Sequence, residues 1–360
     1  MKLYSRGQPA VRGLTLCFPT TTPRQPREHP RTTGLEKLIP LSISSLIDIN
    51  NMSAKINPED VQKVLNKHIE AGNPHSGWED LWARGDDVTL PWDKHNPNPT
   101  LEEILTTKRA ILGGPLHDAS DGAPPRRKKA LVPGCGRGVD VLLLASFGYD
   151  AYGLEYSKSA LEVCIKEEAS AEQKYPVRDA AIGKGKVTWL QGDFFENDWV
   201  ESLGLEGNQF DFIYDYTVRV VFYTGSAWGF HVRNHGLTAA IQFFCALPPS
   251  MRPAWALRHS QILAPSPKGN LVCLEFPRHK DPLQHGPPYA SPSEAYMEHL
   301  SHPGEKIAYD AKGYCKTDPL REPSQQGLER VAYWQPAETH DVGTSEQGEV
   351  LDRVSIWRRR

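Results

Sequence analysis

The sequence predicts a doubly wound α/β fold built on a mostly parallel sheet. From Lys128 onward, short apolar segments alternate with helical ones, a pattern typical of a parallel sheet covered by helices on both faces. Two apolar segments close the chain with no helix between them, which predicts a hairpin-like pair of C-terminal strands. With 360 residues, of which 39% are hydrophobic, the chain can bury one substantial core.

The individual elements follow from local patterns. Strands are expected over 128–134, 150–156, 185–194, 210–217, 269–277, 328–336 and 350–358. Helices are expected over 57–71, 98–112, 138–148, 157–173, 249–265 and 291–302. Asn57 and Ser157 stand at the N-cap positions of the first and fourth of these helices, and Pro58 suits a first helical position. Residues 113–127 are rich in Gly and Pro and predict a surface loop.

The first 51 residues differ in composition from the rest of the chain. Five prolines between Pro9 and Pro30 make a packed helix implausible there. Two interpretations stay open: a mitochondrial transit peptide, or residues added by a start codon upstream of a natural beginning at Met52. Either way we expect one domain over 52–360, with residues 52–112 as a helical lid. The expected location is the cytoplasm, or the mitochondrion if the segment is a transit peptide.

Charge and cysteine usage disfavour several classes of protein. A net charge of −3 argues against a nucleic-acid-binding face, and the basic runs 126–129 and 358–360 are interpreted as solvated strand flanks. The six cysteines are scattered without a CxxC pair, which disfavours a disulfide framework or a zinc site. No apolar run reaches the ~18 residues that span a bilayer. We therefore expect no nucleic acid, membrane or metal partner. Separately, we expect a monomer with a small-molecule partner.

Residues suited to a ligand end four consecutive predicted strands. The first strand ends in a turn with Gly134, Gly136 and Gly138, where backbone N–H groups can approach a ligand closely. The second ends at Glu155, 21 residues after Gly134 (155 − 134), where a carboxylate can accept ribose hydroxyls. The third ends in Asp193-Phe194, an acid for an exocyclic amine and a ring for adenine, and the fourth in Asp215-Tyr216. Each has a simpler structural explanation alone; together they predict a nucleoside site.

From Trp78 to the C-terminus the chain resembles the thiopurine S-methyltransferase superfamily, in particular the thiol, thiocyanate and halide methyltransferases of plants and fungi. The resemblance is carried by WEDLW…PWD, LVPGCGRGVDV, GLEYS, GDFF, FDFIYDYT, FFCALPPSMR and GPPY. It implies a class I S-adenosyl-L-methionine-dependent methyltransferase with a Rossmann-like, mostly parallel sheet and an antiparallel C-terminal strand. It also implies methyl transfer from this donor to a small soft nucleophile: a thiol, hydrosulfide, thiocyanate or halide.

The resemblance also implies which residues form the site. Donor-binding residues would be Trp78, Trp82, Trp92, Gly134, Glu155, Asp193, Phe194 and Tyr216. Aromatic faces attract a sulfonium cation, and Trp78 and Trp82 share one helix face. Candidates for the acceptor pocket are Tyr216, Phe243 and Tyr289, and no catalytic base is assigned because a soft anion needs little or none. Two alternatives stay open: a non-catalytic donor-binding pseudoenzyme, and a small-molecule O- or N-methyltransferase.

Residues 218–242 interrupt the resemblance, because in the family FDFIYDYT runs directly into FFCALPPSMR. The inserted stretch shows no clean period of 2 or 3.6 and predicts no element of its own. Val218-Arg219 and Gln242 permit the GT and CAG borders of an intron. We interpret the segment as an intron translated in frame; the alternative is a true loop that shapes the acceptor pocket.

Overall fold

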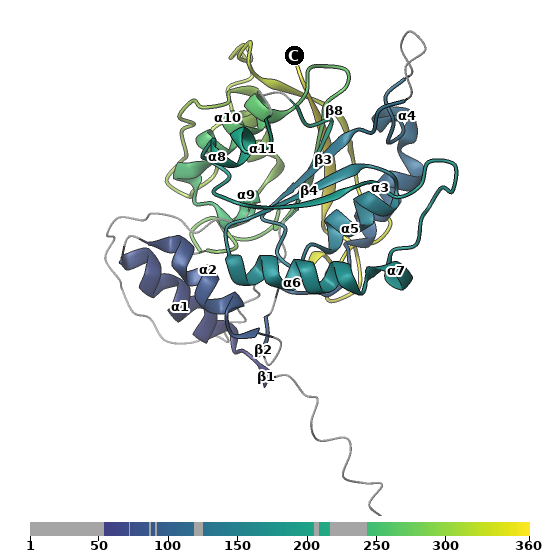
Figure 1. The fold of residues 1–360 in the computed structure, drawn as a ribbon. Coiled ribbons are helices and arrows are strands. Elements are labelled where there is room, and N and C mark those ends of the chain that lie inside the picture. Colours follow the sequence, from purple (N-terminus) through teal and green to yellow (C-terminus); the bar gives the residue numbers. More distant parts are fainter. Residues whose placement is uncertain are drawn as a thin grey trace, which may run out of the picture. The chain divides into compact units, whose positions relative to one another are not determined.

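A seven-stranded sheet organises the computed structural model of the protein (Figure 1). The strand order is β5-β4-β3-β6-β7-β9-β8. The first five strands in this order run parallel, while β9 is antiparallel to both of its neighbours. Their bounds are β3 Lys129–Pro133, β4 Asp150–Glu155, β5 Val187–Gln191, β6 Phe212–Asp215, β7 Asn270–Glu275, β8 Leu328–Trp334 and β9 Arg353–Arg359. The predicted doubly wound, mostly parallel sheet is confirmed.

The structure describes residues 54–71, 73–85, 88–90, 92–118, 125–204, 209–216, 243–284 and 286–360. The chain divides into two units, Met1–Asn51 and Met52–Arg360, and every described element lies in the second. The predictions about residues 1–51 and about the inserted segment 218–242 fall outside the described residues and stay predictions.

Eleven helices accompany the strands in the described part of the chain. Their bounds are α1 Pro58–Glu70, α2 Pro74–Trp82, α3 Pro99–Thr107, α4 Arg109–Leu112, α5 Val139–Ser146, α6 Lys158–Ala169, α7 Ala171–Lys174, α8 Asp198–Glu201, α9 Phe243–Ala246, α10 Arg252–Ile262 and α11 Ser293–Ser301. Two helices expected to be continuous are broken, at Lys108 (φ −105°, ψ 22°) and Ser170 (φ −102°, ψ 5°), because these residues leave the helical region. Two short strands, β1 Ala54–Lys55 and β2 Val88–Thr89, form a separate parallel pair.

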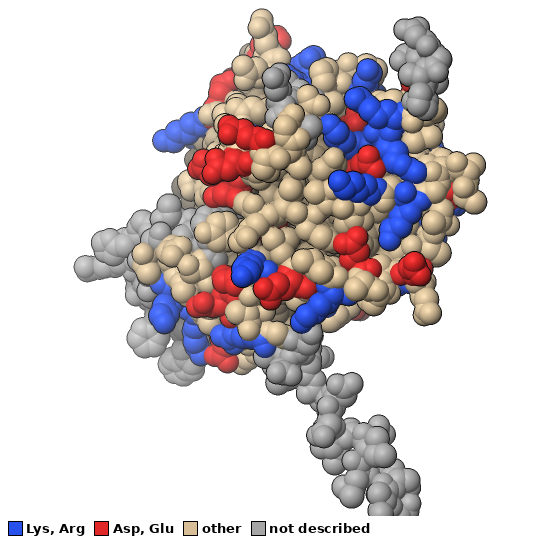
Figure 2. Space-filling view, viewed as in Figure 1, with Lys and Arg blue, Asp and Glu red and all other residues tan. Residues whose placement is uncertain are grey.

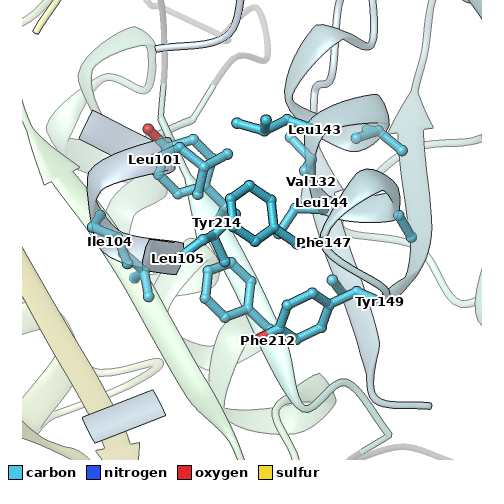
Figure 3. Close-up of a cluster of buried hydrophobic side chains, with 14 of the residues drawn as sticks. Leu101, Ile104, Leu105, Val132, Leu143, Leu144, Phe147, Tyr149, Phe212 and Tyr214 are labelled. Carbon is cyan, nitrogen blue, oxygen red and sulfur yellow. The ribbon is translucent and has the colours of Figure 1, made fainter. Parts of the chain in front are cut away.

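Buried side chains fill both faces of the large sheet. On one face α3 and α5 contribute Leu101, Leu105, Leu144 and Phe147, which meet residues of β6 (Figure 3). On the other face, α10 and α11 pack their own apolar side chains against the sheet. Figure 1 accordingly shows α3 and α5 on one side of the strands and α10 and α11 on the other. This burial on both faces explains why the strands read as continuous apolar runs.

A third apolar cluster joins the N-terminal helices to α6. It contains Val61 and Leu65 of α1, Trp78 and Trp82 of α2, and Ala160 of α6. Because α6 starts directly after β4, this packing places the tryptophans of α2 beside the carboxyl end of β4.

The two basic runs lie at strand ends. Figure 2 shows Lys and Arg side chains gathered on part of one face of the molecule. Arg127 donates to the carbonyl oxygens of Gly148 and Ile182, and Arg358 donates to Asn270 Oδ1 at 2.9 Å. Part of the positive charge of the two runs therefore fixes strand ends and loops. None of the helices that the structure describes has the length and apolar character that crossing a membrane requires.

Candidate active site

The four strand ends singled out in the sequence meet at one edge of the sheet. Strands β5, β4, β3 and β6 are consecutive neighbours and run parallel, so their carboxyl ends lie side by side. Strand order reverses direction between β3 and β6, with the following helices on opposite faces. In open α/β sheets, ligands bind in the crevice at such a switch point. The glycine turn, Glu155, Asp193 and Tyr216 are thus brought together.

The turn after β3 requires its glycines. Gly134, Gly136 and Gly138 have φ values of 58°, 53° and 79°, a region that side chains disfavour. At Gly138 there is also no room, because an added Cβ would lie 2.7 Å from Trp189 Cζ3. Gly138 is the N-cap of α5, so the turn presents the start of that helix to the sheet edge.

Glu155 ties this turn to the start of α6. One carboxylate oxygen accepts the N–H of Gly136 at 3.0 Å, and the other accepts those of Tyr156 at 2.9 Å and Ser157 at 3.1 Å. The residue is buried, and burial raises the pKa of Glu155 although these three hydrogen bonds oppose the rise. Because a carboxylate has about four acceptor sites, roughly one is left for a ribose hydroxyl rather than the two expected from the sequence.

Three clustered tryptophans lie beside the glycine turn, and one of them covers it. The ring of Trp82 lies over Gly136, where an added Cβ would be 3.3 Å from its Cζ2. Trp78 and Trp92 meet edge to face with ring centroids 5.1 Å apart. The indole N–H groups of all three are buried and donate to no acceptor in the described part of the chain. Buried indoles normally have a partner, so these three N–H groups suit a ligand that carries hydrogen-bond acceptors.

Polar contacts hold the covering segment in place. The Arg137 guanidinium donates from Nε and Nη2 to the Asp93 carboxylate, at 2.8 to 2.9 Å and 2.6 Å. Further along the segment, the backbone N–H of Asn98 donates to Asp140 Oδ1 at 3.2 Å. Burial raises the pKa of Asp140 to about 7, with the hydrogen bond from Asn98 opposing the rise. Sequence reasoning missed both contacts; an Arg inside a glycine turn was the signal that could have suggested the first.

The Asp193-Phe194 pair lies in the loop that follows β5. Asp193 Oδ1 accepts the N–H of Phe195 at 2.9 Å, as in a turn that starts a helix. The Phe194 ring is 2% exposed and packs against the His259 ring, with the ring centroids 5.1 Å apart, within the apolar cluster on that face of the sheet. Arg258 of α10 fixes the loop by donating to the carbonyl oxygens of Phe194 and Glu196.

A cavity of about 440 Å³ lies beside this loop, between α2 and the ends of β4 and β5. Its lining residues are Ser76, Glu79, Tyr156, Lys158, Gln191 and Gly192. Tyr156, which lines this cavity, directly follows Glu155 in the chain. We expect the nucleoside of the ligand to reach into this cavity.

The candidates for the acceptor pocket lie in two places: one follows β6, and the other two lie at or beside α9. Tyr216 is 7% exposed, and its ring lies near those of Tyr214 and His340, at 6.0 and 6.1 Å. Burial raises the pKa of Tyr216, and the charge of Asp352 adds to the rise. Tyr289 is joined to α9 by its N–H, which donates to Cys245 O. Phe243 is the first residue of α9, and its side chain lies outside what the structure describes.

Comparison with known proteins shows which family the chain resembles. The family model described as thiopurine S-methyltransferase matches residues 73–224. Probable thiol methyltransferase 2 of Arabidopsis thaliana is 29% identical over 268 residues, covering 74% of this chain and 88% of the relative. Thiocyanate methyltransferase 1 of Brassica oleracea is 29% identical over 282 residues, covering 78% and 91%. The chain resembles the thiopurine S-methyltransferase superfamily over most of its length. A thiopurine S-methyltransferase of Pseudomonas fluorescens is also similar, 28% identical over 171 residues, 47% of this chain and 63% of the relative.

The methyl donor of this methyltransferase is S-adenosyl-L-methionine, and the described residues fit it. The donor, when bound, supplies a methyl group already activated by its sulfonium. Trp78, Trp82 and Trp92 would offer it indole N–H groups and ring faces, and Glu155 an acceptor for a ribose hydroxyl. What this chain itself must do is hold, orient and shield the reacting atoms from water.

Proposed function

We propose that the protein transfers the methyl group of S-adenosyl-L-methionine to a small soft nucleophile, namely a thiol, hydrosulfide, thiocyanate or halide, by in-line displacement. Two relatives, one named a probable thiol methyltransferase and one a thiocyanate methyltransferase, support the choice of acceptor. A soft anion reacts with a sulfonium carbon without first losing a proton. The site then needs positioning and exclusion of water more than acid–base chemistry.

The low basicity of two buried histidines also supports this proposal. Burial lowers the pKa of His340, beside Tyr216, to about 4, and the charge of Lys94 adds to the effect. Burial also lowers the pKa of His299, beside Phe244, to about 3, with Arg252 adding to it. Both imidazoles are therefore neutral and weakly basic near pH 7. They would be poor proton acceptors for an alcohol or amine, which favours an acceptor that arrives as an anion.

One observation favours a second candidate. The Asp140 carboxyl, with its pKa raised to about 7 by burial, lies near enough to Tyr214 and Tyr216 for its charge to raise their pKa values as well. A carboxylate of that basicity could accept a proton from an acceptor that binds in its neutral form. This would suit an O- or N-methyltransferase, or a thiol that binds protonated.

Methyl-transfer assays distinguish these possibilities. Purified protein is incubated with the donor and, separately, with iodide, thiocyanate, hydrosulfide, a small thiol, a phenol and an amine, and methylated products are measured by gas chromatography. Turnover with the soft anions alone supports the proposal. Turnover with the phenol or amine alone contradicts it, and donor binding without any turnover indicates a pseudoenzyme.

A further inference from the structure

Glu79 joins the helix that carries the tryptophans to the helix that follows the ribose-binding strand. It lies on α2, next to Trp78 and three residues before Trp82. Glu79 Oε2 accepts the hydroxyl of Ser157 at 2.7 Å, and Oε1 accepts that of Ser159 at 2.6 Å. The N–H of Ser159 also approaches Oε2, at 3.3 Å. One side chain of α2 therefore occupies the first turn of α6.

The local electrostatics favour an ionised Glu79. Burial raises its pKa, but the hydrogen bonds from Ser159 and Ser157 outweigh burial, and the pKa of Glu79 is lowered overall. Ser157 is the N-cap of α6, its hydroxyl accepting the N–H of Ala160 at 3.0 Å. A carboxylate at a helix N-terminus is further favoured by the helix dipole. These contacts make the junction between α2 and α6 a charge-assisted one.

The same contacts continue into the donor site. Ser157 gives its hydroxyl to Glu79 and its backbone N–H to Glu155, which in turn holds the N–H of Gly136. At the other end, α2 places Trp82 over Gly136. These contacts connect the tryptophans, the ribose-binding carboxylate and the glycine turn in one continuous set. Within this set, Glu79 is the link between α2 and α6. Glu79 also lines the cavity beside Tyr156, so this link forms part of its wall.

We propose that Glu79 is a positioning residue that latches α2 onto α6 and thereby sets how tightly, and for how long, the donor and its demethylated product are held. Closing the latch fixes the tryptophans over the glycine turn and orients Ser157 and, through it, Glu155. Exchange of donor for product requires α2 to move away, which breaks the hydrogen bonds to Ser157 and Ser159. The inference rests on the donor site and not on the identity of the acceptor.

The test uses the full-length protein with Glu79→Ala, Glu79→Gln, Ser159→Ala and the double variant Glu79→Ala/Ser159→Ala. Glu162→Gln is the matched control, because Glu162 is an exposed glutamate on α6. Affinity for S-adenosylhomocysteine is measured by calorimetry, its release by stopped-flow tryptophan fluorescence, and stability by urea unfolding. None of these measurements needs an acceptor, so an error in the proposed acceptor class does not affect them.

We expect Glu79→Ala to weaken product binding about 10-fold to 100-fold, mainly through faster release, and Glu79→Gln to fall between it and the unchanged protein. Ser159→Ala should have a smaller effect, and adding it to Glu79→Ala should change little further, because the two groups act through one contact. Glu162→Gln should release product at the unchanged rate. Unchanged affinity and release in Glu79→Ala and Glu79→Gln would overturn the proposal. Two other results would also overturn the proposal. One is a lower free energy of unfolding with normal affinity of the folded fraction, and the other is additive effects of Glu79→Ala and Ser159→Ala.

Discussion

Replacing Glu155 by Gln tests whether this carboxylate both builds the turn and binds the donor. The carboxylate accepts three backbone N–H groups, one on Oε2 and two on Oε1. A carboxamide has a single acceptor oxygen, so its NH₂ group must face either Gly136 or the pair Tyr156 and Ser157. At least one buried N–H then loses its partner and meets another donor.

The expected loss follows from these contacts. A hydrogen bond to a charged group contributes about 1.5 to 3 kcal/mol, and stranding a buried donor costs about 1 to 3 kcal/mol. Removing a buried charge, whose burial raises the pKa of Glu155, offsets part of this. We therefore expect the free energy of unfolding to fall by about 1 to 3 kcal/mol, and affinity for S-adenosyl-L-methionine to fall about 10-fold to 100-fold.

Urea unfolding followed by circular dichroism gives the first quantity, and titration calorimetry of the donor gives the second. Glu162→Gln, the same chemical change at an exposed site on α6, should alter neither. A Glu155→Gln protein with unchanged stability would show that the three hydrogen bonds contribute little. One with unchanged donor affinity would refute the assignment of Glu155 to the ribose.

Four further predictions address other parts of the chain. A protein that starts at Met52 should match the full chain in melting temperature and methyl transfer, and a large loss on truncation would show that residues 1–51 pack. Deleting Val218 to Gln242 should restore or raise stability and methyl transfer; if transcripts always encode these residues and the deletion abolishes activity, the segment is functional. Gly138→Ala should destabilise the protein by about 2 kcal/mol or more in urea unfolding, because φ is 79° and the new Cβ meets the Trp189 ring. The pKa of Asp140 is raised from 3.8 to about 7 in the folded state, so the folded protein binds more protons than the unfolded chain between these two pH values. The free energy of unfolding should therefore fall as pH rises through that window. Asp140→Asn should flatten this slope, and an equal slope in both proteins would count against the raised pKa. If Asp140 is also a base, the same variant should lose turnover with a neutral thiol while keeping it with iodide.

Local patterns in the sequence were sufficient for the elements and for the edge where the site lies. The alternation of apolar runs and amphipathic segments located β3, β4 and β5 to within a few residues. This was possible because strands of a parallel sheet are buried on both faces and therefore consist mainly of apolar residues. Ser157 was predictable as an N-cap because capping involves residues three apart. The strand-end residues met at one edge because parallel strands leave no other arrangement.

Only the tertiary structure decided which of these residues remain free for a ligand. It placed β9 between β7 and β8, turned the Phe194 ring into the core, and used three of the acceptor sites of Glu155 on backbone N–H groups. It also paired Arg137 with Asp93, and Glu79 with Ser157 and Ser159, across 44, 78 and 80 residues of chain. The spacing of residues in the sequence does not predict contacts between residues so far apart in the chain. Such contacts depend on how whole helices pack and on which polar groups lose their contact with water when they are buried. The sequence therefore determined the kind of site, and the packing of α2 against α6 determined where the tryptophans lie beside it.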